Sequence, residues 1–307
     1  MASAQIMEGG FWFANSYAEA AGRFLIACDD LREAGHKVEN ERLEIGMTGP
    51  DGEPLCIDVA IVGSLQSGKV LLSTSGVHGV EGYPGSAIQL AVMDDLCKDD
   101  SFKDHAIIFV HAINPYGMAW WRRFNENNVD LNRNFLKRDQ KYEGVPVGYE
   151  TIREFINPES PPPQKERWFK LKALNLIRKY GFNNLKQCVA EGQYEYPKAI
   201  QYGGDCLQPG PELLLNWLDN KLESVNRIWA IDLHTGLGPS GHDTLLISAG
   251  MGPEDFSRLD ALFPGHVETL DPNSGVGYEI VGDLHQGLED RYSDIEWTSI
   301  TQEFGTF

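Results

Sequence analysis

The stretch VLLSTSGVHGVEG, residues 70–82, is the most informative for the fold, because an apolar β-strand runs in it directly into a turn of small residues. The turn carries His78 and Glu81, three residues apart. In an open α/β sheet, ligands bind beyond the carboxyl ends of the strands, where these two side chains are expected to lie. The glycines of the turn let the backbone bend sharply and approach a ligand closely. The stretch therefore predicts an α/β sheet with a functional site at the end of this strand.

Strand and helix patterns alternate along the rest of the chain. Apolar runs typical of buried strands lie at 106–113, 227–233, 244–248 and 299–304, helical spacing is found at 13–34, 85–97, 165–180, 211–224 and 253–263, and two strands at 42–47 and 55–62 flank a turn at 49–52. This alternation predicts a three-layer α/β/α fold around a mixed, mainly parallel twisted sheet.

The same patterns decide the expected domain organisation. Motifs before and after the proline-rich run at 157–163 are interpreted as parts of one site, so this run is expected to be a surface loop and not a domain linker. We therefore expect one domain over residues 1–307, with an inserted helical and loop region at about 136–225.

The chain is strongly acidic, since it contains 45 Asp and Glu but 26 Lys and Arg, which gives a formal charge of −19. Phosphate backbones and anionic membrane surfaces repel such a protein, so neither nucleic acid nor a membrane is expected as a partner. The 307 residues, 42% of them hydrophobic, are enough for a sizeable core. The oligomeric state is left open by the sequence.

Five cysteines are far apart and form no CxxC pair, which argues against a disulfide framework and against a thiolate metal site. The N-terminal residues lack a basic start followed by an unbroken apolar run, so no secretory signal is expected. No stretch approaches the ~18 apolar residues of a membrane helix. These features favour a reduced, cytoplasmic protein.

A metal site is predicted from three side chains. His78 and Glu81 alone are a weak signal, because such a pair is usually a solvated turn. His234, in IDLHTG at 231–236, follows a second apolar strand in the same way. A single histidine there would more often be satisfied by backbone, but two matching strand ends favour a shared cation. Two imidazoles and one carboxylate suit zinc and leave its fourth position open.

The polar segment NVDLNRNF, residues 128–135, interleaves apolar residues, which suits one side against the core and the other facing a cleft. Asp130 is expected to accept a hydrogen bond from a ligating histidine and to fix its tautomer. Asn132 and Arg133 are expected to hold a substrate carboxylate, which a guanidinium binds in bidentate fashion. The alternative is a surface cluster of salt bridges.

Glu303 stands inside the β-prone run SITQEFGT, residues 299–306. Burying a carboxylate there without a partner would be costly. Beside an activated water it has a purpose as the general base, since it would accept the proton as the water attacks. The alternative is a glutamate on an edge strand that points to solvent.

The order of these motifs resembles the zinc carboxypeptidase (M14-like) superfamily, from residue 40 or so to the end, without much of 136–225. HxxE at His78, DLNR at Asp130, a strand-end histidine and a strand glutamate are all present, and the HGxE form is similar to the aspartoacylase and succinylglutamate desuccinylase branch. The chain looks closest to an uncharacterised bacterial carboxypeptidase-like group. The resemblance implies one zinc ion and the three-layer fold.

The resemblance also implies an arginine that stabilises the oxyanion, for which Arg122 and Arg123 are the candidates and Arg123 is preferred. A mobile tyrosine over the substrate would be Tyr278 or Tyr292, and no motif selects between them. The chain stops at Phe307, where the resemblance implies a closing helix, and a truncated C-terminal end would explain this.

These motifs together predict a zinc-dependent hydrolase that cleaves an amide bond next to a free carboxylate, in a small-molecule or peptide substrate. A metallocarboxypeptidase is the first reading and an N-acyl amino acid deacylase is the second. A binding protein that kept the fold and lost catalysis is the rival from another class. Of the other histidines, His111 is expected in the core, and His242 and His285 at the surface.

Overall fold

The computed structural model describes residues 12–98, 105–158, 160, 168–247, 253–269 and 280–306. Within them, eight strands form one sheet in the order β1-β2-β4-β3-β5-β8-β6-β7. The strands are β1 (Val38–Thr48), β2 (Pro54–Gly63), β3 (Lys69–Ser75), β4 (Ala106–His111), β5 (Arg227–Thr235), β6 (Asp243–Ile247), β7 (Val267–Thr269) and β8 (Glu296–Phe304). Four of the pairings are parallel and three are antiparallel, so the predicted mixed, mainly parallel sheet is confirmed.

The centre of the sheet decides where a site can form. Strands β4, β3, β5 and β8 are neighbours and run parallel to one another. Their carboxyl ends therefore lie along one edge of the sheet, where the segments that follow them meet.

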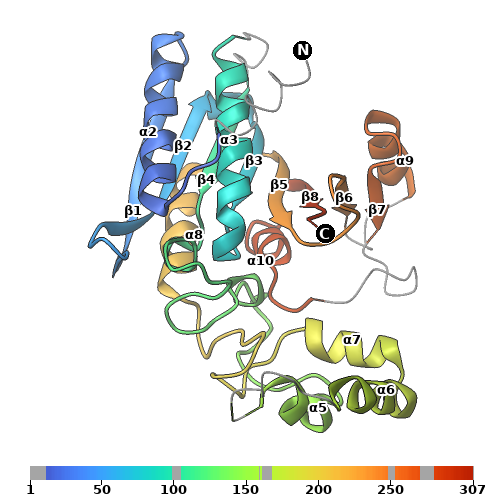
Figure 1. Ribbon diagram of the computed structural model, residues 1–307. Helices are drawn as coiled ribbons and strands as arrows, with labels where there is room; N and C mark the ends of the chain where they lie inside the picture. The colour runs from blue at the N-terminus through green and yellow to red at the C-terminus, as the bar shows by residue number, and fades with distance from the viewer. Residues whose placement is uncertain are drawn as a thin grey trace, which may run out of the picture.

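Helices cover both faces of the sheet (Figure 1). α2 (Tyr17–Glu33) and α3 (Gly82–Leu96) pack on one face, and α8 (Pro209–Lys221) and α10 (Leu284–Arg291) on the other. The side chains of the strands alternate accordingly: on β2, Ile57 and Val59 face α8, whereas Ala60 and Val62 face α2 and α3. The predicted three-layer α/β/α fold is confirmed.

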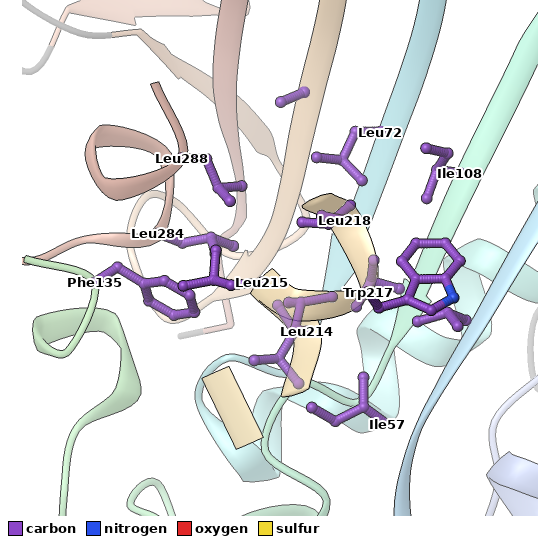
Figure 2. Close-up of a cluster of buried hydrophobic side chains, with 14 of the residues drawn as sticks. Ile57, Leu72, Ile108, Phe135, Leu214, Leu215, Trp217, Leu218, Leu284 and Leu288 are labelled. Atoms are coloured by element: carbon purple, nitrogen blue, oxygen red, sulfur yellow. The ribbon is translucent and has the colours of Figure 1, made fainter. Parts of the chain in front are cut away.

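The core between the sheet and α8 is apolar and closely packed. Figure 2 shows Leu218 of α8 beside Leu72 of β3, and Leu214 of α8 toward Ile57 of β2, with all four side chains buried. Leu284 of α10 joins the same cluster. This core fixes α10, and with it the segment before α10, against the sheet.

The remaining elements are α4 (Pro115–Ala119), α5 (Tyr149–Ile156), α6 (Phe169–Tyr180), α7 (Phe182–Ala190), α9 (Pro253–Leu262) and the short helices η1 (Leu65–Ser67), η2 (Gly79–Glu81) and η3 (Leu131–Arg133). Figure 1 shows α5, α6 and α7 together, away from the sheet, whereas α8 packs on it. The expected insertion at 136–225 thus contains an outlying helical part and a helix of the main layers, and the single-domain organisation stays a prediction. No described helix is long and apolar enough to cross a membrane.

His111 lies in the core, as predicted. It is fully buried in β4, its Nε2 lies 2.9 Å from the Ser86 hydroxyl, and its ring stacks on Phe24 with centroids 4.9 Å apart. Burial disfavours the charged ring and lowers the pKa of His111 from 6.5 to about 3.

The low pKa of His111 predicts an acid-sensitive fold. Between pH 6.5 and 3 the unfolded chain binds a proton at this ring that the folded protein does not, so stability falls as pH falls through this window. From pH 6.5 to 5, wild type should lose about 1.6 kcal/mol more unfolding free energy than a His111→Gln variant. Urea denaturation at both pH values measures this, and equal losses in the two proteins would contradict it.

Candidate metal centre

The turn that carries His78 and Glu81 is held by close backbone contacts. Gly76 has a positive φ of 67°, and a Cβ on Gly79 would lie 2.2 Å from the carbonyl carbon of Gly117, so both positions need glycine. The amide of Gly79 donates to the carbonyl of Arg123 at 3.1 Å. These contacts fix η2 directly after β3, at the carboxyl edge of the sheet.

The three predicted ligands converge at this edge. His78 Nδ1 lies 2.9 Å from Glu81 Oε1, and His234 Nδ1 lies 3.2 Å from Glu81 Oε2. One possible ligand atom from each residue lies within 4.8 Å of the other two, and the histidine rings meet edge to face at 4.9 Å. The structure therefore brings together the His–Glu–His group that the sequence predicts.

The donor set fits a metal ion. Both ring nitrogens of His78 are buried, and within the described residues neither makes a hydrogen bond. Orphaned buried polar atoms are rare because they are costly, and a cation between His78 Nδ1, His234 Nδ1 and the Glu81 carboxylate would satisfy His78 Nδ1, whereas Nε2 faces Asp130. Two imidazoles and a carboxylate are the ligands of a zinc site that keeps one position open.

Electrostatics favours the ionised form of Glu81 at this group. Burial alone would raise the pKa of the Glu81 carboxyl, but the His78 and His234 rings outweigh it and hold that pKa below its usual range. Burial likewise opposes the charged ring of His234, whereas Asp232 and Glu81 raise its pKa. Zinc must therefore compete with a proton for His234.

Each histidine also meets a buried carboxylate on its far side. Asp130 Oδ1 lies 3.3 Å from His78 Nε2, where its predicted orienting role requires it. Asp232 Oδ2 lies 2.6 Å from His234 Nε2, and the Thr74 hydroxyl donates to its other oxygen at 2.7 Å. Such contacts fix the tautomer and the ring orientation of a ligand.

Asp232 was missed by the sequence analysis, although a signal was present. In IDLHTG, Asp232 precedes His234 by two residues on a strand, so both side chains point to the same face of the sheet. An aspartate two residues before a strand-end histidine is therefore a sequence feature that could have identified it.

Arg123, and not Arg122, lies at this group. Arg123 Nε donates to Asp130 Oδ2 at 3.0 Å, and its Nη1 lies 3.5 Å from Glu81 Oε1. Arg122 is exposed, with its guanidinium over the ring of Tyr116. Burial would raise the pKa of Asp130, but the charges of Arg123 and His78 hold it well below its usual range.

Glu303 is buried on an interior strand beside the three ligands. In the register of β5 and β8 it is paired with His234, and β6 covers the other side of β8. Only 7% of its surface is exposed, so the alternative of a solvent-facing edge glutamate is wrong. Its Oε2 accepts one hydrogen bond, from the Leu237 amide at 3.4 Å, and burial raises the pKa of its carboxyl.

Asn132 and Arg133 lie in η3, directly after Asp130, and both are buried. Asn132 Oδ1 accepts from the Leu284 amide at 3.0 Å, and within the described residues its Nδ2 makes no hydrogen bond. Arg133 donates through Nε and Nη2 to the Ala190 carbonyl at 2.9 and 2.6 Å, and through Nη1 to the Asn132 carbonyl. The Ala190 carbonyl, at the end of α7, thus accepts two of the three hydrogen bonds that the Arg133 guanidinium donates.

Three further expectations concern His242, His285 and the tyrosine that would cover a substrate. His242 is exposed, as predicted, but His285 is half-buried with its Nε2 enclosed, so its expected surface position is wrong. Tyr292 packs against Trp297 and donates to Asp219 at 2.8 Å, on the α8 side of the sheet. Tyr278, the other tyrosine considered as a lid, lies outside the described residues.

Solved structures with the same fold include a fibrinolysis inhibitor and a carboxypeptidase. Bovine thrombin-activatable fibrinolysis inhibitor, solved with a tick carboxypeptidase inhibitor, matches with a TM-score of 0.53 at 12% identity, covering 95% of this chain and 86% of that chain. Carboxypeptidase A from Helicoverpa armigera matches with a TM-score of 0.55 at 14% identity, covering 95% and 65%. At these identities the likeness shows the fold, so the predicted zinc-carboxypeptidase-like architecture is confirmed.

Sequence comparisons identify the family. A search of curated proteins finds no match. A family model described as "Protein of unknown function (DUF2817)" matches residues 13–307, which is nearly the whole chain. The chain, a carboxypeptidase-like fold with a His–Glu–His group at the carboxyl edge of its sheet, therefore belongs to the DUF2817 family.

Proposed function

We propose that the protein is a zinc-dependent hydrolase that binds one zinc ion and cleaves an amide bond next to a free carboxylate, as a metallocarboxypeptidase does. The observation that carries the proposal is the convergence of His78, Glu81 and His234 beside a buried glutamate, Glu303, on the neighbouring strand. A site that only binds a ligand has no need of such a base.

In the proposed reaction, the metal and the side chains of the protein have different roles. When bound, zinc supplies Lewis acidity, which polarises the scissile carbonyl and makes water a nucleophile at neutral pH. Glu303 accepts the proton of the attacking water and returns it to the leaving amine. Its raised pKa suits both steps, because a base that must later act as an acid works best with a pKa near the working pH.

Arg123 is proposed to stabilise the oxyanion that forms at the carbonyl. Its guanidinium already lies beside Glu81 and is about one-third exposed, so it borders the ligands and can still be reached from solvent. A cationic donor directed at developing charge contributes roughly 3–4 kcal/mol to lowering a barrier of this kind.

The substrate carboxylate is proposed to bind Asn132 and Arg133. Asn132 Nδ2 is the donor without a partner among the described residues, and Arg133 uses three of its N–H groups on carbonyls of Ala190 and Asn132. A guanidinium has five N–H donors, so two remain for a substrate.

The expected cytoplasmic location stays a prediction.

Asp232 provides a test of the metal centre that leaves the ligands intact. Replacing Asp232 with Asn removes the charge that orients His234, so zinc affinity should fall about 10- to 100-fold. Competition with a fluorescent zinc chelator measures this. Asp219→Asn is the matched control, because Asp219 of α8 pairs with Arg291 at the end of α10, away from the site. Equal zinc affinities of wild type and Asp232→Asn would contradict the assignment.

The direct test of the function is a hydrolysis screen of the zinc-loaded chain. Short peptides and N-acyl amino acids are offered, each as the free acid and as its C-terminal amide. The proposal expects cleavage of free acids and at least about tenfold slower cleavage of the amides, because an amide cannot form the charged pair with Arg133.

Each other outcome of the screen has a definite meaning. Cleavage of N-acyl amino acids without cleavage of peptides would identify the deacylase alternative. Stoichiometric zinc without any hydrolysis would favour the binding protein. If the protein takes up no zinc, the proposed hydrolase fails at its first step.

A further inference from the structure

The hairpin of α6 and α7, residues 168–190, exposes large apolar side chains at a density unusual for a protein surface. Within α6 no residue is buried. The exposed apolar residues, between 38% and 64% accessible, are Trp168, Phe169, Leu171, Leu174, Ile177 and Phe182. Figure 1 shows the hairpin at the bottom of the molecule, apart from the sheet. Several large exposed apolar side chains on one short hairpin are a feature of interaction sites.

The same hairpin is basic, whereas the chain as a whole is acidic. Residues 168–190 contain five basic residues and no acidic one, in a protein of formal charge −19, which leaves −24 for the rest. The basic residues are Lys170, Lys172, Arg178, Lys179 and Lys186. The basic hairpin is attracted to an anionic surface, whereas the acidic remainder of the chain is repelled by it. This charge asymmetry turns the hairpin toward such a surface.

Basic and apolar side chains share one exposed face of α6. Arg178 follows Leu174 by four residues and Leu171 by seven, and Lys170 precedes Leu174 by four, so all lie on adjoining turns of one side. All four side chains are exposed. Lysine and arginine on such a face can lay their stems along apolar surface while the charge reaches the polar layer above it.

We propose that the α6–α7 hairpin docks on an anionic lipid surface. Its apolar side chains would enter the boundary between headgroups and acyl chains, and its basic side chains would contact the lipid phosphates. Exposed Trp, Phe and Leu together with Lys and Arg are the composition of helices that lie in a membrane interface. The inference is independent of the proposed hydrolase activity.

The charges argue against a second copy of the chain as the occupant. In a two-fold dimer the same patch would meet itself, so the five basic residues of one hairpin would face the five of the other, and residues 168–190 contain no acidic residue to separate them. The whole-chain charge predicted that membranes repel this protein, but exposed charges are screened beyond about 8–10 Å. The local charge of the hairpin, and not the total, therefore decides its attraction.

Vesicle co-sedimentation of the full chain tests the proposal. Wild type should bind vesicles of phosphatidylcholine with one-third phosphatidylglycerol, should not bind phosphatidylcholine alone, and should dissociate in high salt. A Lys170→Gln/Arg178→Gln variant should bind about 25-fold more weakly, at about fivefold for each basic residue. A Trp168→Ser/Leu174→Ser variant should lose binding by at least tenfold or so, because it removes apolar side chains that enter the interface.

Matched controls keep the test specific. Lys98→Gln/Arg258→Gln removes the same two charges from α9 and the end of α3, and Leu262→Ser removes an exposed leucine from α9. Both should bind like wild type. All the substituted side chains are well exposed, so folding should not be affected.

Three outcomes would overturn the proposal. One is the absence of binding to anionic vesicles at low salt, and another is equal loss of binding in hairpin and control variants. The third is a wild-type dimer in analytical ultracentrifugation that the Trp168→Ser/Leu174→Ser variant converts to a monomer, since the hairpin would then be a self-association surface.

Discussion

Replacing Glu303 with Gln should lower kcat of the zinc-loaded protein by about 10²- to 10⁴-fold, with its zinc content unchanged. Glutamine has nearly the same shape but cannot accept the proton of the attacking water. The substitution should disturb the fold little, because the only hydrogen bond of this carboxylate within the described residues is a long one to the Leu237 amide. The measurement is kcat and KM on the substrate found in the screen, with zinc determined on the same sample.

Glu296→Gln is the matched control for this prediction. Glu296 lies on the same strand, β8, but at its other end, where it pairs with exposed Arg227. It should retain kcat within about twofold, as is usual for surface substitutions. A Glu303→Gln protein that binds zinc and keeps kcat within tenfold or so of wild type would exclude Glu303 as the base.

The layers of the fold could be predicted, because the burial of helices and strands gives their apolar residues a regular spacing in the sequence. Strands such as 106–113 and 227–233 are covered on both faces and so are almost continuously apolar. Four helices, α4, α5, α7 and α10, were not predicted. α7 carries two asparagines in its first turn and α10 a glycine in its middle, so their helical periodicity is weak and tertiary contacts decide their conformation.

The ligands of the candidate metal centre could be predicted because each is one short step from a strand end. His78 follows β3 and His234 ends β5, and parallel neighbours place both at one edge. Asp130 was likewise proposed from its segment, and its carboxylate lies beside His78, while its orienting role stays a prediction. The sequence could not decide between Arg122 and Arg123, because the two are adjacent and of the same residue type. The backbone conformation decides which of the two side chains points toward the site.

The surroundings of Arg133 could not be predicted, because its partner comes from a distant part of the chain. The Ala190 carbonyl lies at the end of α7, 57 residues further on, and nothing in either segment encodes the contact. A helix C-terminus carries partial negative charge, so it can interact with a guanidinium partly as a carboxylate would. Contacts of this kind depend on how the insertion folds back, which local patterns do not specify.

Zinc should stabilise the wild-type protein strongly, and a His78→Ala variant hardly at all. At a free zinc concentration about 100 times Kd, a ligand that binds only the folded state adds about 2.7 kcal/mol of unfolding free energy. For a chain of this size that corresponds to a rise in Tm of roughly 4 °C. His78→Ala removes one of the three ligands, so the same zinc concentration should leave its Tm within about 1 °C of its metal-free value. Differential scanning calorimetry of metal-free and zinc-loaded samples measures both shifts.

Two variants make this result specific to the proposed site. His242→Ala removes an exposed histidine, so its zinc-dependent rise in Tm should equal that of wild type. Glu303→Gln should also keep the rise, because the base is not a ligand, and this separates loss of catalysis from loss of metal. If His78→Ala retains the full rise in Tm while His242→Ala loses it, zinc binds at the surface, and the buried nitrogens of His78 need another partner.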